Sequence, residues 1–158
     1  MYALLLAALL AGAGRAPDEQ TFRIGELELS APSGLWELSG SGDRYLIDCT
    51  ANACEDVSAT VEVTAAARCT PEAVVADMAD AYNPRRPAEQ VRTAGGLGLW
   101  VAYGDPGCRN WSGAMVSACT VHGGRAYHIR SLDGHCERQP RADQALMGFL
   151  QTLRPARP

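Results

Sequence analysis

The chain has 158 residues, a length that suits a single domain with a substantial hydrophobic core. Its composition, 47% hydrophobic and 20% charged, excludes a disordered or fibrous protein. A net charge of −4, with arginine as the sole basic side chain among 14, argues against a nucleic-acid partner, which would need a basic patch.

The N-terminal segment, residues 1–16, has the pattern of a secretory signal peptide. An apolar run of leucine and alanine over residues 2–11 is followed by small residues that suit cleavage, and the run is too short to span a bilayer. No basic side chain precedes the run, and an uncleaved N-terminal anchor is the alternative. We therefore expect a periplasmic or secreted protein in which residues 17–158 form one domain, without a stable membrane span after cleavage.

Residues 22–65 predict the first strands. Residues 22–29 alternate between apolar and polar but change phase at Gly25, which predicts a bulge. Trp36 is expected to cover one end of the core, and residues 39–43 to form a flexible loop ahead of a short strand over residues 45–49. Residues 57–65 alternate most clearly, with Val and Ala at odd positions, so one face of this strand should be buried.

Two helices are predicted. Thr70 can cap the first, with Pro71 at its first position and Glu72 near the positive end of its dipole, and apolar residues at helical spacing continue to Tyr82. The second is amphipathic over residues 141–153, and the proline-rich residues that follow should fray.

A β-hairpin over residues 113–132 is the central prediction. Gly123 and Gly124 suit a tight turn with positive φ, and this turn places Cys119 opposite His128. One face of the hairpin is expected in the core: Val116, Ala118, Thr120, Tyr127 and Ile129. The other face is mixed: Met115, Ser117, Cys119, Val121, His128, Arg130 and Leu132.

Strands that occur in runs, rather than alternating singly with helices, predict the α+β class. We expect an antiparallel sheet of about six to seven strands with two packed helices, stapled by disulfides.

Six cysteines fit an oxidising, exported setting, and three disulfides are expected. No Cys-x-x-Cys occurs, which argues against zinc-ribbon and thioredoxin-type sites. Cys108 and Cys136 are the first expected pair, because both should lie in loops at the same end of the hairpin. Cys49 and Cys54 flank a short connection and can form a local bridge. Cys69 and Cys119 remain as the third pair.

A series of marks runs along residues 22–153: the opening strand that leads to Ala-Pro-Ser-Gly-Leu-Trp at 31–36, the helix opened by Thr-Pro-Glu at 70–72, Gly-Gly at 95–96 before a strand, Gly-Gly-Arg-Ala-Tyr-His-Ile at 123–129, and a closing amphipathic helix. In this order the chain resembles the PsbP-like α/β sandwich, a fold shared with small exported bacterial proteins of the DcrB type. The resemblance implies a binding or accessory protein and assigns no active site. The six cysteines depart from that group.

Candidate binding residues lie in two predicted loops, residues 104–111 and 133–139. Arg109, Trp111 and Arg138 are placed there to meet a polar or acidic ligand, and the alternative is ordinary loop surface with Trp111 packed inward. Cys119 and His128 would form a nucleophile pair if Cys119 were a free thiol.

Neither a metal nor a cofactor is expected. His122, His128 and His135 fall in unlike places (a turn, mid-strand and a loop), whereas a metal needs converging ligands. Phosphate-loop and dinucleotide-binding motifs are missing from the sequence. Asp77 and Asp80 are expected on the solvated side of the first helix.

We therefore expect an exported, non-catalytic binding or accessory protein for an unknown protein or small ligand in the periplasm or cell envelope. The alternatives are a secreted inhibitor that presents a disulfide-stapled loop, such as residues 104–111, and an enzyme that uses Cys119 and His128.

Overall fold

The computed structural model describes residues 18–49, 54, 57–78, 83–84, 87–105, 115–132 and 141–158. The predicted signal peptide, residues 1–16, lies outside these ranges. Within them, no helix has the length and apolar character needed to cross a membrane.

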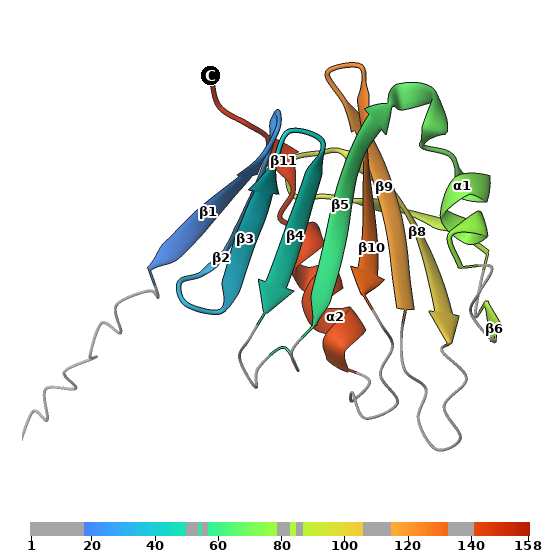
Figure 1. The fold of residues 1–158 in the computed structure, drawn as a ribbon, viewed down its shortest axis with the longest axis horizontal. Coiled ribbons are helices and arrows are strands. Elements are labelled where there is room, and N and C mark those ends of the chain that lie inside the picture. The colour runs from blue at the N-terminus through green and yellow to red at the C-terminus, as the bar shows by residue number, and fades with distance from the viewer. Residues whose placement is uncertain are drawn as a thin grey trace, which may run out of the picture.

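The larger of two antiparallel sheets contains eight of the described strands (Figure 1). In spatial order they are β3 (Trp36–Ser41), β4 (Arg44–Cys49), β5 (Ser58–Ala65), β10 (Arg125–Leu132), β9 (Met115–His122), β8 (Gly98–Asp105) and β6 (Asn83–Pro84), and β7 (Glu89–Arg92) also pairs with β8. The hairpin β9–β10 lies inside this sheet and has the predicted register, with Cys119 opposite His128.

The smaller sheet has the order β1 (Glu19–Ile24), β2 (Leu27–Pro32) and β11 (Arg154–Pro155). Together with helix α2 (Arg141–Leu150) it encloses the main core against one face of the large sheet. Trp36 is buried there, as expected, and its ring stacks on that of Phe149 with centroids 4.4 Å apart.

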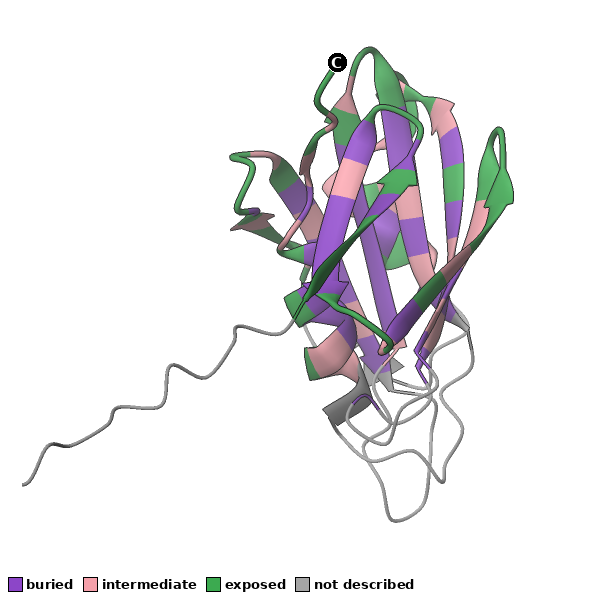
Figure 2. Ribbon diagram, turned by 90° about the vertical axis from the view of Figure 1, so that its left-hand side faces the viewer, coloured by how far each residue is buried: buried purple, intermediate pink, exposed green. Residues whose placement is uncertain are grey.

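Burial alternates along β5, whereas β9 is buried on both faces from residue 116 to residue 120 (Figure 2). The five hairpin residues expected in the core are all buried: Val116, Ala118, Thr120, Tyr127 and Ile129. The odd-numbered residues of the β5 region are buried as expected from Val57 to Val63, whereas Ala65 is exposed at the end of the strand. The predicted core face of the hairpin is therefore confirmed, while Ser117 and Cys119 on its mixed face are buried as well.

The other helix, α1, packs on the opposite face of the large sheet. A short 3₁₀ helix, η1 (Ala66–Arg68), leads from β5 into α1 (Pro71–Ala76), which lies against β8 and β9. Val74 and Met78 are buried under it with Ala102 and Cys119 in a separate small core. The two helices thus cover different faces, and α1 covers only part of its own.

Three predictions about local structure are wrong. Gly25 does not form a bulge: it has a φ of 58° and lies in the two-residue turn between β1 and β2. Residues 39–41 belong to strand β3 rather than to a loop. The proline-rich end does not fray, because β11 pairs with β2 and the N–H of Ala156 donates to the carbonyl of Glu26 at 2.8 Å.

The fold is therefore mostly antiparallel sheet with two short helices, in two sheets where one had been expected. Helix α1 ends at Ala76, with a turn at residues 77–78, and the predicted continuation over residues 79–82 lies outside the described ranges. Disulfides join Cys49 to Cys54 and Cys69 to Cys119, two of the three pairs expected from the sequence. The third expected pair, Cys108 and Cys136, falls in residues that the structure does not describe.

Candidate ligand-binding site

A pocket of about 570 Å³ lies on the face of the large sheet that α1 covers only in part. Its floor is formed by side chains of β5 and β10: Thr60, Glu62, Thr64, His128 and Arg130. Its wall is formed by residues of η1, α1 and their flanks: Ala67, Arg68, Thr70, Ala73, Ala76 and Asp77. We call these eleven residues the polar groove.

The floor follows from the alternation of two neighbouring strands. Val61 and Ile129 point into the core, so the residues beside them point to the opposite face. The antiparallel register then places Glu62 opposite His128 and Thr60 opposite Arg130. Because such pairs have Cβ atoms about 4.5–5.5 Å apart, the floor brings hydroxyl, carboxylate, imidazole and guanidinium groups onto one surface.

The wall begins where β5 ends. η1 redirects the chain, and Thr70 then starts α1 as a side-chain cap, its Oγ1 accepting a hydrogen bond from the N–H of Ala73 at 3.1 Å. Pro71 occupies the first helical position, where its missing N–H costs nothing. Val74 and Met78 anchor the helix on the sheet, and Ala73 and Ala76 face the groove with small side chains.

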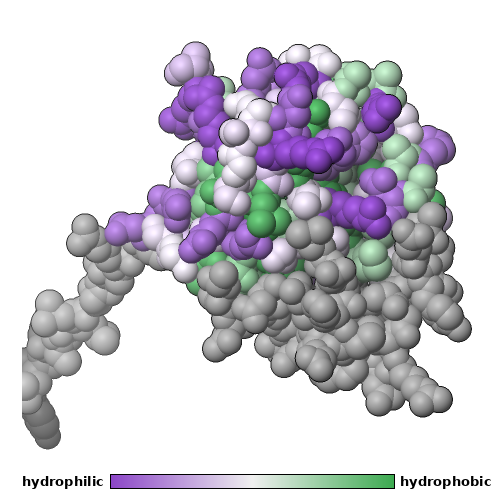
Figure 3. Space-filling model, viewed as in Figure 1, coloured by the Kyte–Doolittle hydropathy of each residue, from purple (hydrophilic) through white to green (hydrophobic). Residues whose placement is uncertain are grey.

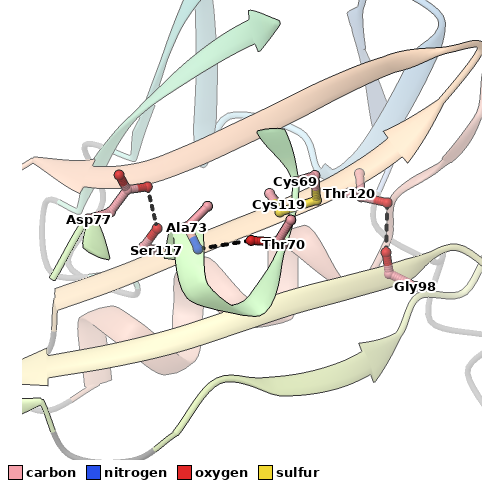
Figure 4. Close-up of a disulfide and its surroundings, with 8 residues drawn as sticks. All are labelled: Cys69, Thr70, Ala73, Asp77, Gly98, Ser117, Cys119 and Thr120. Atoms are coloured by element: carbon pink, nitrogen blue, oxygen red, sulfur yellow. Dashed lines mark hydrogen bonds between the residues drawn. A yellow bond between two sulfur atoms is a disulfide. The ribbon is translucent and has the colours of Figure 1, made fainter. Parts of the chain in front are cut away.

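Two contacts with β9 fasten this wall (Figure 4). The disulfide of Cys69 with Cys119, whose Cα atoms are 5.6 Å apart, fixes the chain just before α1. The hydroxyl of Ser117 donates a hydrogen bond to Asp77 Oδ2 at 2.9 Å and fixes the chain just after it. Asp77 is half-buried rather than fully solvated, so the expectation for it was wrong, and Asp80 lies outside the described residues.

Several polar groups of the groove have no partner among the described residues. The side chains of Glu62, Arg68 and Arg130 form no ion pair or hydrogen bond with any residue that the structure describes. His128 Nε2 and Thr64 Oγ1 are buried without a hydrogen-bond partner. Buried polar atoms are nearly always hydrogen-bonded, so these two atoms are suited to a bound molecule or water.

The surrounding surface is polar. In Figure 3, which has the view of Figure 1, hydrophilic side chains gather over the strands of the large sheet and leave only small hydrophobic patches. The described part of the chain has two large hydrophobic side chains that are exposed, Val75 and Val121. This face is therefore suited to polar contacts rather than to a large apolar partner.

The residues proposed from the sequence fare differently. Arg109, Trp111 and Arg138 lie outside the described residues. Cys119 lies opposite His128, but its sulfur is bonded to Cys69, so the two cannot act as a thiolate–imidazole pair. Within the described ranges, no group of three His, Cys, Asp or Glu side chains is arranged to hold a metal ion.

Sequence reasoning missed the groove although it found most of its floor. It placed His128 and Arg130 on the mixed face of the hairpin, and Glu62 on the polar face of the β5 region. It missed that these two strands are neighbours and that the following segment folds back beside them. Comparison with known proteins adds no relative: no family model and no curated protein matches the chain.

Proposed function

We propose that this chain is an exported, non-catalytic binding protein and that the polar groove holds a small polar ligand. The observation that carries the proposal is the set of polar groups in the groove without partners among the described residues. His128 Nε2 and Thr64 Oγ1 are buried in it, and Glu62, Arg68 and Arg130 bring charges of both signs. A ligand in the groove could supply the hydrogen bonds and ion pairs that these polar groups do not make within the described part of the protein.

Export is supported by two features. The N-terminal segment has the signal-peptide pattern, and the two disulfides are consistent with an oxidising compartment. A binding rather than catalytic role is supported by the disulfide at Cys119, which removes the nucleophile that an enzyme based on Cys119 and His128 would need. The resemblance to PsbP-like proteins implies the same kind of role.

A ligand screen tests the proposal. Thermal unfolding of the exported protein, disulfides intact, is followed in the presence of a panel of amino acids, organic acids, polyamines, sugars and nucleotides. A ligand that binds the folded state alone raises the unfolding temperature by mass action. We expect at least one compound to stabilise the natural chain and to lose its effect in a variant that carries His128→Gln and Arg130→Gln.

The control variant is Arg125→Gln. Arg125 is exposed and pairs with Asp43 between two hairpin turns, and neither residue lines the groove. Its stabilisation by the ligand should match that of the natural chain. If every stabilising compound acts equally on the groove variant, or if none stabilises the natural chain, the groove is not the binding site.

A further inference from the structure

The groove contains a carboxylate, Glu62, and a guanidinium, Arg130, that are neighbours but do not form an ion pair. Glu62 on β5 lies opposite His128 on β10, and Arg130 is the next residue along β10 on the same face. Diagonal neighbours of this kind are about 7–8 Å apart at their Cα atoms, within reach of long side chains. Among the described residues, Glu62 and Arg130 nevertheless form no ion pair with each other or with any other group.

A second carboxylate lies on the other side of Arg130. Its cross-strand neighbour on β9 is Ser117, whose hydroxyl binds Asp77 on the wall of the groove. Arg130 therefore has a carboxylate on either side, with Glu62 as its diagonal neighbour on β5 and Asp77 beyond Ser117, and Arg68 of η1 adds a second guanidinium to the wall. A ligand of a single sign would meet repulsion from one half of these charges, whereas a ligand with both signs can pair with both.

The side chains that line the groove limit how large and how apolar a ligand can be. Three alanines supply the aliphatic contacts of the wall, Ala67, Ala73 and Ala76, and no Phe, Tyr or Trp is among the described residues of the groove, where the imidazole of His128 is the one aromatic ring. Sugars and nucleobases are commonly held by stacking on aromatic rings, so this lining favours a compact ligand dominated by charged groups.

We infer that the ligand of the polar groove is a small zwitterion of the α-amino-acid type. Its ammonium group pairs with Glu62, its carboxylate pairs with Arg130, and a second acidic group, where present, reaches Arg68. This inference rests on the proposed function, because it names the chemistry of the same site.

Isothermal titration of the exported protein, disulfides intact, with three related probes tests the inference. L-Glutamate carries both signs, glutarate carries only the carboxylates, and putrescine carries only ammonium groups. Because a charge-assisted hydrogen bond is worth about 1.5–3 kcal/mol, L-glutamate should bind about tenfold or more tightly than either relative. Glu62→Gln should weaken L-glutamate about tenfold without weakening glutarate, while Arg130→Gln should weaken both and Arg125→Gln neither.

The other possible outcomes reject either the zwitterion or the proposed function. Equal affinity for L-glutamate and glutarate would make the groove an anion site and reject the zwitterion. Failure of all three probes, while a compound that is not a zwitterion still stabilises the protein through the groove, would reject the zwitterion and leave the proposed function standing. Both ideas fail if no compound at all binds through the groove. Because Glu62 is exposed and lies outside the core, its variant is expected to fold, and the three probes separate the outcomes on the natural chain alone.

Discussion

Ser117 and Cys119 lie two positions apart on the same face of β9, and each holds one end of α1: Cys119 through its disulfide with Cys69, Ser117 through its hydrogen bond to Asp77. Helix α1 has six residues, far fewer than an isolated helix needs to be stable in water. The position of the groove wall therefore depends on these two attachments and on the burial of Val74 and Met78.

The long-range disulfide should contribute more stability than the local one. Closing a loop over a sequence separation of 50 restricts the unfolded chain by about 4 kcal/mol, against about 2 kcal/mol for the separation of 5 between Cys49 and Cys54. Replacing Cys69 and Cys119 with alanine should thus lower the free energy of unfolding in urea by roughly 2 kcal/mol more than the same change at Cys49 and Cys54. Equal losses would show that loop closure is not the dominant effect.

The bond between Ser117 and Asp77 should appear as a coupling energy. Ser117 is fully buried, and removal of Asp77 would leave its hydroxyl without this partner. Hydrogen bonds to charged groups contribute about 1.5–3 kcal/mol. A double-mutant cycle with Ser117→Ala and Asp77→Ala, measured by chemical denaturation, should yield a coupling of about 1–2 kcal/mol. Simple additivity of the two changes would contradict the contact.

The cap of α1 should matter for stability and for ligand binding together. Thr70→Ala removes the acceptor for the N–H of Ala73 and should cost about 1 kcal/mol, while Thr70→Ser keeps the acceptor and should cost much less. Since Thr70 and Ala73 both line the groove, ligand affinity should fall in the alanine variant and persist in the serine variant. Thermal unfolding with and without ligand measures both effects, and indistinguishable variants would argue against the cap.

Two turn glycines offer a matched pair of substitutions. Gly25 and Gly34 both have positive φ, 58° and 82°, so alanine at either position is strained by about 1–2 kcal/mol. At Gly34 the new Cβ meets nothing within 4 Å, but at Gly25 it meets the hydroxyl oxygen of Tyr127 at 3.0 Å. That hydroxyl accepts a hydrogen bond from the N–H of Glu26 and links the two sheets. Gly25→Ala should therefore be the more destabilising in urea unfolding, and the reverse order would contradict the packing.

The elements that the sequence predicted best are those whose signal is local. The hairpin around Gly123 and Gly124 and the capped start of α1 at Thr70 depend on residues a few positions apart, and both occur as expected. The prediction missed the second half of β3 because its exposed residues, such as Ser39 and Ser41, show no alternation of apolar and polar side chains. A change of phase at Gly25 fits a bulge and a tight turn equally well, so the first sheet was misread.

The groove was beyond local reasoning for a different reason. Its floor requires knowing that β5 pairs with β10, although 59 residues lie between Ala65 and Arg125, which are partners at one end of the two strands. Its wall requires knowing that η1 turns the chain back over β9. The disulfide of Cys69 with Cys119 was the sequence clue to that return, since it ties the start of α1 to the hairpin.

Along β10, Tyr127 and Ile129 are buried in the core while His128 and Arg130 line the groove. The same strand therefore contributes to the core with one face and to the groove with the other. Substitutions at His128 and Arg130 can therefore change the groove without changing the core face of β10. A combinatorial library restricted to Thr60, Glu62, His128 and Arg130 would test whether the lining of the groove alone determines what binds there.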